Sequence, residues 1–309
     1  MGSIIASAPG SLMLLGEHAV LHGRRALVMA VDQRLRVTLT PRRDSRIEID
    51  SALGRHQTTL QNPAPHPDFR FIMEAIRRVA DRLARGFDLR VDADFSHTIG
   101  FGSSAAVTAA TVAALRRHGG MEEDLAAIRD EAIAIVRAVQ GRGSGADVAA
   151  SVHGGVVAYR AEPREVRTLA AALDICAVYC GYKTPTAEVI RRVEAQWAGR
   201  EARLAELYDR IDACAGDGRN ALEAGDLSAL GAALNHGQKL MEALGVDTPE
   251  LAAIVAALRA DPGVRGAKIS GSGLGDCAIG LGRPLHPPPG FTAIQVRAAA
   301  TGLTLAPAA

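Results

Sequence analysis

The stretch HTIGFGSSAAVTAA, from His97 to Ala110, places two glycines and two serines directly before a run of small helix-forming residues. Glycine adopts backbone conformations that other residues avoid, and a serine at a helix start satisfies backbone N–H groups. Such a turn also exposes N–H groups where the helix dipole is positive, which favours a bound phosphate. The stretch therefore indicates either a simply capped helix or a phosphate-binding loop.

The composition of the chain excludes several classes of function. Its 309 residues are 48% hydrophobic and 22% charged, an ordinary globular composition with length for roughly two domains. The net charge of +1 provides no basic field for nucleic acid. No apolar run approaches the roughly 20 residues of a membrane span, and the N-terminal segment lacks the basic start of a signal peptide. We therefore expect a cytoplasmic protein that binds neither nucleic acid nor membranes.

The cysteines indicate a reduced protein without a zinc centre. Cys176, Cys180, Cys214 and Cys277 form no C-x-x-C pair, and their neighbours are apolar. We expect all four to be reduced and structural. Paired His and Cys spacings typical of zinc sites do not occur.

The periodicity of apolar residues predicts an α+β protein in two parts. Strands are expected over 34–41, 46–50, 87–95, 154–161, 173–184 and 292–298, and on both sides of a glycine loop within 266–282. Helices are expected over 69–85, from the glycine-serine turn to about 117, and over 122–139, 186–214, 226–244 and 249–260. The segment 162–171 is interpreted as a linker between the two parts.

Three polar glycine loops stand at predicted element boundaries, which is more than helix capping requires. They are Pro9–Gly16, followed by Glu17 and His18, then Gly100–Ser104, and Gly271–Gly275. Neither the P-loop motif nor the dinucleotide-binding fingerprint occurs. The three loops together favour phosphate binding over capping.

The segments APGSLMLLGEHAVLHG, GFGSSAAVTAA and KISGSGLGDCAIGLG resemble the three signature motifs of the GHMP small-molecule kinases, in their order and approximate spacing. The resemblance spans nearly the whole chain. GEHAVLHG, from Gly16 to Gly23, and LMEALGVDTPEL, from Leu240 to Leu251, are similar to the mevalonate kinase branch. The turn QGRGSGADVAASV instead resembles phosphomevalonate kinases.

The resemblance implies a fold and an activity. The fold would comprise an ATP-binding domain over 1–162, resembling ribosomal protein S5 domain 2, and a ferredoxin-like domain over 163–309. The activity would be ATP-dependent phosphorylation of mevalonate in isoprenoid precursor biosynthesis, with Mg²⁺, in the cleft between the domains. Phosphomevalonate kinase, or a non-catalytic ligand sensor on the same fold, is the alternative. The oligomeric state stays open, with a homodimer as one expectation.

The resemblance also assigns roles to residues. Asp147 matches the catalytic aspartate that accepts the hydroxyl proton. The nucleotide phosphates would be held by Gly100, Phe101, Gly102, Ser103, Ser104 and Ala105, with the hydroxyls of Ser103 and Ser104 offered to Mg²⁺. The substrate would be bound by Glu17, His18, Thr186, Gly271, Ser272 and Gly273. Among the other histidines, we expect His97 and His153 to lie nearest the cleft.

Four positions depart from the family pattern. Ser11 stands where many members have a lysine close to the catalytic aspartate, and Val136 stands where mevalonate kinases often have a metal-binding glutamate. Leu274 and Asp276 stand where glycine is common. Asp276 is interpreted either as a turn residue or as a negative charge near the phosphates.

The missing lysine raises the question of which cation replaces it. The chain has only three lysines, of which Lys183 follows a predicted strand and precedes the segment resembling the substrate loop. We therefore predict that Lys183 reaches the cleft as a catalytic residue, with Arg142 as the next candidate. A solvent-exposed loop lysine is the alternative, because lysine is rarely buried.

Overall fold

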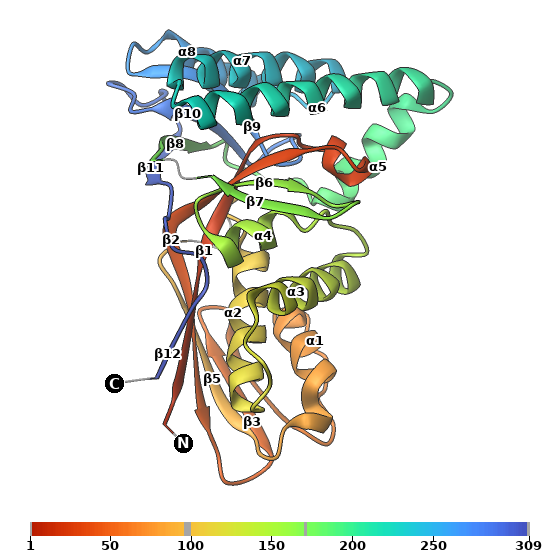
Figure 1. The fold of residues 1–309 in the computed structure, drawn as a ribbon, viewed down its shortest axis with the longest axis vertical. Helices are drawn as coiled ribbons and strands as arrows, with labels where there is room; N and C mark the ends of the chain where they lie inside the picture. The colour runs from red at the N-terminus through yellow and green to blue at the C-terminus, as the bar shows by residue number, and fades with distance from the viewer. Residues whose placement is uncertain (1, 96–99, 170–171, 308–309) are drawn as a thin grey trace.

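The computed structural model describes residues 2–95, 100–169 and 172–307, and it contains two sheets with helices beside them (Figure 1). In the first sheet the strands run β12-β1-β2-β5-β3-β4, and β6 and β7 extend it from β2. The second sheet has the order β11-β8-β10-β9. This mixed architecture confirms the predicted α+β class.

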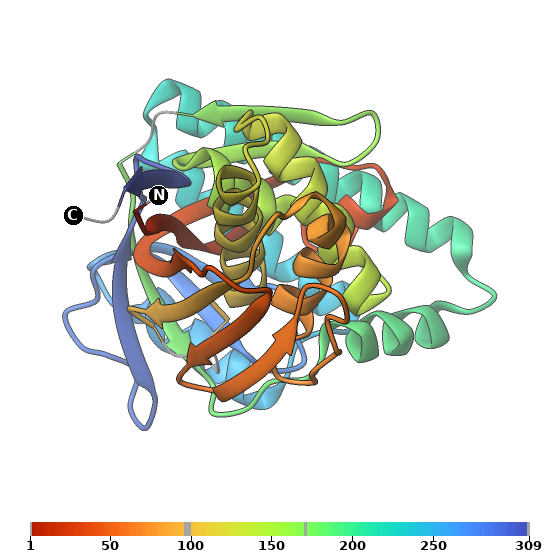
Figure 2. The same ribbon diagram turned by 90° about the horizontal axis from the view of Figure 1, so that it is seen from below.

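The strand bounds are as follows. The first sheet comprises β1 (Ile4–Leu15), β2 (Ala26–Pro41), β3 (Arg46–Ser51), β4 (Gly54–Thr59), β5 (Phe87–Ala93), β6 (Val156–Arg160), β7 (Glu165–Leu169) and β12 (Thr304–Pro307). The second sheet comprises β8 (Asp174–Tyr179), β9 (Val264–Ser270), β10 (Cys277–Gly282) and β11 (Thr292–Arg297). Since β12 pairs with β1, Ile4 lies opposite Pro307, and the first and last strands of the chain run side by side, as Figures 1 and 2 show.

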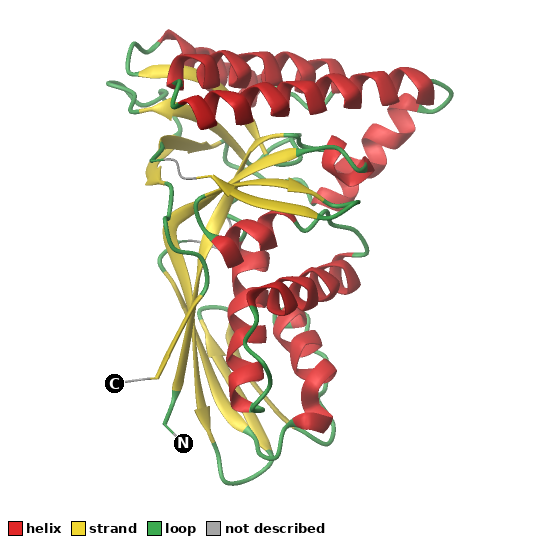
Figure 3. Ribbon diagram, in the orientation of Figure 1, coloured by secondary structure: helices red, strands yellow, loops and turns green. Residues whose placement is uncertain are grey.

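The helices fall into two groups, seen most clearly in Figure 3. The first group lies beside the first sheet and comprises α1 (Arg70–Val79), α2 (Ser103–His118), α3 (Leu125–Gln140) and α4 (Ala146–His153), with the short 3-10 helix η2 (Ala80–Arg82). The 3-10 helix η1 (Ala19–His22) instead lies against the second group, where the ring of its His22 stacks on Tyr208. The second group comprises α5 (Thr186–Trp197), α6 (Glu201–Ala224), α7 (Leu227–Leu244) and α8 (Pro249–Ala260). No helix in the described part of the chain is both long and apolar enough to span a bilayer.

Helix α2 begins in the glycine-serine turn and packs against β1 and β2. Six of its sixteen residues are alanine, and Ala106, Ala109 and Ala113 are fully buried. Small side chains allow the helix to lie close to the sheet, and a helix that is apolar on nearly every side belongs in an interior. The small, apolar side chains that follow the turn therefore allow α2 to pack closely against the first sheet.

Three of the expected elements differ from the structure. The helix predicted over 186–214 is two helices, because the chain turns at Gly199 with φ +77°. The helix predicted over 69–85 ends at Val79 and continues as η2. The predicted linker 162–171 contains β7, which pairs with β6 in antiparallel register. Both β7 and β12 therefore belong to the first sheet, and the division of the chain at 162/163 stays a prediction.

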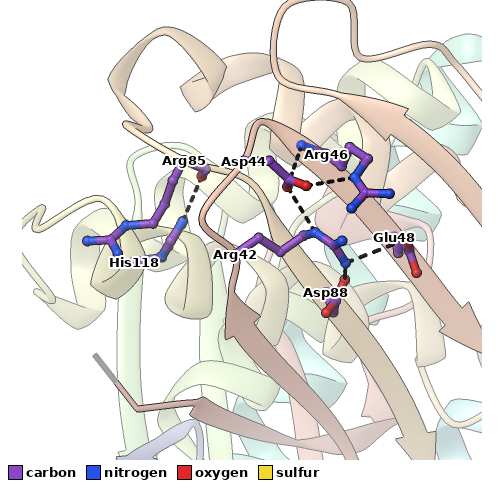
Figure 4. Close-up of polar contacts among 7 residues, drawn as sticks. All are labelled: Arg42, Asp44, Arg46, Glu48, Arg85, Asp88 and His118. Carbon is purple, nitrogen blue, oxygen red and sulfur yellow. Dashed lines mark hydrogen bonds and ion pairs between the residues drawn. The ribbon is translucent and has the colours of Figure 1, made fainter.

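A cluster of charged residues ties three strands together at one end of the first sheet (Figure 4). Arg42 contacts Asp44 at 3.0 Å, Asp88 at 2.5 Å and Glu48 at 3.6 Å. Hydrogen bonds from the Arg46 and Arg42 side chains lower the pKa of Asp44 to about 2. The cluster holds the end of β2 against β3 and β5, while the glycine loops lie elsewhere.

Candidate active site

The segment expected as the first glycine loop is strand β1 as far as Leu15, because its residues pair with β2, and the chain leaves the strand only at Gly16. This segment, still called the first loop below, lies in direct contact with the second glycine loop. The backbone N–H of Ser11 in β1 donates to the carbonyl of Phe101 at 3.0 Å. Gly102 adopts φ +62°, and a Cβ atom there would lie 2.1 Å from Ser11 Oγ. A Cβ atom at Gly10 would lie 2.6 Å from Phe101 O. The glycines are therefore needed for the close approach of the strand and the loop, and for the left-handed turn before α2.

Asp147 lies in the first turn of α4, facing the same contact. The hydroxyl of Ser11 donates to Asp147 Oδ1 at 2.9 Å. Burial raises the pKa of Asp147, and the Ser11 hydrogen bond and the positive charge of Lys183 oppose that rise. The charges of Glu17 and Asp276 add to it. The structure thus brings together a half-buried carboxylate and the start of α2, with serine at the position where a lysine was expected.

Lys183 reaches this region from the segment after β8. Its Nζ lies 2.8 Å from Asp276 Oδ2, and 43% of its side chain is exposed. It also acts electrostatically on Asp147. The other candidate cation, Arg142, pairs with Glu194 at 2.5 Å, where both side chains are about half exposed. The geometry therefore favours Lys183 over Arg142 as the cation of the site.

Glu17 and His18, expected on the substrate side, are both buried and join the first loop to the second sheet. The carboxylate of Glu17 forms an ion pair with Lys268, which has no exposed side-chain surface and also donates to the carbonyl of Ile269. Within the described residues, Glu17 Oε2 has no hydrogen-bond partner. One oxygen of the Glu17 carboxylate is therefore bound to the ammonium of Lys268.

His18 connects the first loop to the third. Its Nε2 lies 2.8 Å from Ser272 O, so this nitrogen carries the hydrogen that the carbonyl accepts. Burial lowers the pKa of His18, which favours the neutral ring. The residue adopts φ +59°, an uncommon conformation outside glycine. The strained turn places the imidazole against the loop Gly271–Gly275.

The third loop is held from two other sides. The N–H of Leu274 donates to Val246 O at 2.8 Å, and the hydroxyl of Thr184 donates to Leu274 O at 2.6 Å. A Cβ atom at Gly273 would lie 2.5 Å from Val246 O. Thr186, the predicted substrate ligand, is exposed at the start of α5. Thr184 therefore anchors the loop, a role that the sequence did not suggest.

The structure describes only one of the two histidines that were expected nearest the cleft. His97 lies outside the described residues. His153 is the last residue of α4, and its Nε2 lies 3.3 Å from Arg129 Nη1 of α3. Because Asp147 is in the first turn of the same helix, His153 lies at the opposite end of α4 from the loops.

The donor set near the loops suits a nucleotide-bound magnesium ion better than a protein-held one. No group of three or more His, Cys, Asp or Glu side chains within the described residues could hold a metal. Val136, which stands where a glutamate was expected, is buried in the core. Mg²⁺ is commonly bound through one or two carboxylates together with substrate phosphates, and it keeps several waters. Ser103 and Ser104, half-buried in the first turn of α2, carry hydroxyl groups of a kind that could complete such a shell.

Comparison with known proteins agrees with this geometry. The model of the GHMP kinases N terminal domain matches residues 70–155, and that of the GHMP kinases C terminal matches residues 219–297. A galactokinase galactose-binding signature matches residues 2–41. The second and third loops thus lie within the two kinase matches, and the first loop lies within the signature.

Individual relatives match most of the chain. The mevalonate kinase of Aeropyrum pernix is 32% identical over 287 residues, which cover 89% of this chain and 87% of the relative. That of Archaeoglobus fulgidus is 33% identical over 279 residues, covering 90% and 92%. The crystal structure of L. major mevalonate kinase in complex with R-mevalonate superposes with a TM-score of 0.79 at 24% identity, covering 96% of each chain. The chain therefore belongs to the GHMP kinase family.

Proposed function

We propose that the protein transfers a phosphoryl group from ATP to mevalonate, forming phosphomevalonate. The observation that carries the proposal is the hydrogen bond from Ser11 to Asp147, since Ser11 also contacts the glycine-serine turn before α2. Support for mevalonate comes from relatives of that name that match about nine-tenths of the chain. The reaction would supply a precursor for isoprenoid synthesis.

The residues around the Ser11–Asp147 hydrogen bond take different parts in the proposed reaction. Asp147 orients the acceptor hydroxyl and takes its proton, while the amides from Gly100 to Ala105 hold the nucleotide phosphates. Lys183 offsets the negative charge that develops in transfer. Mg²⁺, held by the ATP phosphates with Ser103 or Ser104, would neutralise part of the phosphate charge when bound. The buried His18 and the third loop face the acceptor side.

Two other acceptors deserve direct comparison. The match to the galactose-binding signature makes galactose one of them. Phosphomevalonate, the other, carries an extra phosphate and needs additional cations. Two arginines that could supply them are engaged elsewhere, because Arg142 pairs with Glu194 and Arg192 pairs with Glu188. The preference for mevalonate over phosphomevalonate therefore rests on the relatives of that name.

The test is ADP release from ATP with mevalonate, phosphomevalonate and galactose as separate acceptors. We expect kcat/KM for mevalonate to exceed that for each of the others by at least about tenfold, the effect of roughly one lost charge-assisted contact. A preference for either other acceptor overturns the assignment of substrate. Stabilisation by ligands without any turnover would instead identify a sensor.

Replacing Gly102 by Ala is expected to lower kcat/KM for ATP by about tenfold or more. The added Cβ would lie 2.1 Å from Ser11 Oγ, so the serine must leave Asp147 or the phosphate loop must shift. Gly120→Ala is the matched control, because Gly120 has φ +64° and open space around it at the other end of the same helix. Equal kinetics for the two variants would show that only backbone strain matters at Gly102.

Replacing Lys183 by Ala is expected to cost about 2–4 kcal/mol in kcat/KM, because a charge-assisted contact to the transferring group is lost. Lys183→Met should be nearly as damaging, since the loss is of charge and not of bulk. Lys239→Met provides the control, because Lys239 is exposed on α7. Steady-state kinetics that leave both Lys183 variants above half of wild-type kcat/KM would make Lys183 a surface residue.

A further inference from the structure

Asp276 closes the third glycine loop in a backbone conformation that few residues other than glycine adopt. Its φ is +71°, and its backbone is paired on both sides with the segment that leads to Lys183. The N–H of Asp276 donates to Tyr182 O at 2.8 Å, and its carbonyl accepts from Cys180 N–H at 2.9 Å. The loop and the lysine segment are thus held together by backbone bonds that do not depend on either charge.

The side chains of Asp276 and Lys183 contribute unequally to their ion pair. The pair measures 2.8 Å, with 15% of the Asp276 side chain exposed and 43% of the Lys183 side chain exposed. A short, mostly buried carboxylate is the fixed partner, whereas lysine carries its ammonium on a flexible four-carbon stem. The position of the ammonium is therefore set by Asp276.

The carboxylate of Asp276 also touches the phosphate loop. A Cβ atom at Gly100 would lie 2.4 Å from Asp276 Oδ1 and 2.5 Å from Oδ2. A negative charge at this place repels a phosphate and raises the pKa of Asp147, whereas Lys183 has the opposite effect on Asp147. The charges of Asp276, Lys183 and Asp147 are therefore electrostatically coupled.

We propose that Asp276 is a positioning residue for phosphoryl transfer, which holds the ammonium of Lys183 at the edge of the Gly100 loop and within electrostatic reach of Asp147. The inference rests on the proposed kinase function and assigns Asp276 a task within it. Asp276 contacts neither the reacting atoms nor the acceptor in this account. The Asp276 carboxylate repels the nucleotide phosphates, but it also fixes the ammonium of Lys183 where the transferring group passes.

The proposal predicts opposite effects on turnover and on nucleotide binding. Asp276→Asn keeps the size of the side chain and tolerates the left-handed backbone, but it no longer fixes the ammonium. We expect kcat to fall by about tenfold, on the scale of a displaced charge-assisted contact. The KM for ATP should stay level or fall, because a like charge leaves the phosphate loop. Mere damage to the loop would instead raise KM and lower Tm.

The test compares wild-type protein, Asp276→Asn, Lys183→Met and the double variant in steady-state ATP and mevalonate kinetics. If Asp276 acts through Lys183, Asp276→Asn changes kcat by less than about twofold in the Lys183→Met background, because residues in one network are not additive. Asp50→Asn is the control, since Asp50 pairs with Arg55 at an exposed site on β3 and β4.

Two results overturn the proposal while the kinase function stands. One is an Asp276→Asn variant that retains more than half of wild-type kcat. The other is an equal loss of kcat with and without Lys183, which would show that Asp276 acts independently of the lysine. A wild-type protein without phosphoryl transfer to any acceptor overturns the proposed function, and this inference with it.

Discussion

Replacing Asp147 by Asn is expected to lower kcat by about 10²-fold or more, while the affinity for ATP changes only a few-fold. The amide retains the size of the carboxylate and can still accept the hydrogen bond from Ser11, which is 2.9 Å long in the native protein. It cannot take the proton of the acceptor hydroxyl. The measurement is steady-state turnover together with nucleotide titration of both proteins, with Asp50→Asn as a control for loss of a carboxylate elsewhere.

The pH dependence of the native enzyme provides an independent readout of Asp147. Burial raises the pKa of this carboxyl above its ordinary value of about 3.9, and the base is active only when ionised. Activity should therefore be lost as the pH falls through the raised pKa, and the acid limb of kcat/KM should lie above the ordinary range. The Asn variant should lack this limb in its residual activity. Near-normal turnover in the variant would remove Asp147 from the mechanism.

Replacing Lys268 by Met is expected to lower the free energy of unfolding by about 3–5 kcal/mol, the usual cost of removing one partner from a buried ion pair. Lys268 is fully buried, and Glu17 is 3% exposed. Methionine would leave the carboxylate in the interior with neither of its oxygens paired to a cation. Because the pair joins the first loop to β9, the loss should also disturb His18 and the third loop.

Denaturant unfolding of four proteins measures this effect. They are wild type, Lys268→Met, Glu17→Gln and the double variant, in which the two losses should be less than additive because the residues are in contact. Asp50→Asn again provides the exposed comparison, where an ion pair contributes about 0–1 kcal/mol. A Lys268→Met protein within about 1 kcal/mol of wild type would show that the pair does not hold the sheets together.

The glycine-serine turn before α2 could be predicted from the sequence, because glycine spacing and helix starts are local features. The place of Asp147 beside it was implied only by the resemblance to the GHMP kinases. Gly102 adopts φ +62° in the turn before α2. A glycine directly before a run of small helix-forming residues indicates such a turn. The short strands at the edges of the first sheet were harder to predict from the sequence. Strand β12 has four residues, and β7 alternates poorly, so neither has a hydrophobic pattern that distinguishes a strand from a linker.

The buried ion pair could not be predicted for a different reason. Strand β9 is buried on both faces over its last five residues, so alternation does not say which way Lys268 points. The partner, Glu17, is 251 positions away along the chain. The same holds for Asp276 and Lys183, whose pairing depends on the register of β8 and β10. Contacts between distant segments require the sheet register, which local patterns do not contain.

Ser11, Gly102 and Asp147 meet where the phosphoryl group of ATP is proposed to pass to mevalonate. The most direct test follows wild type and Asp147→Asn by ³¹P NMR with ATP, Mg²⁺ and mevalonate. We expect a new phosphomonoester resonance that grows in step with ADP in the wild type and is nearly absent in the variant. Release of inorganic phosphate without a phosphorylated acceptor, or equal product formation by both proteins, would contradict it.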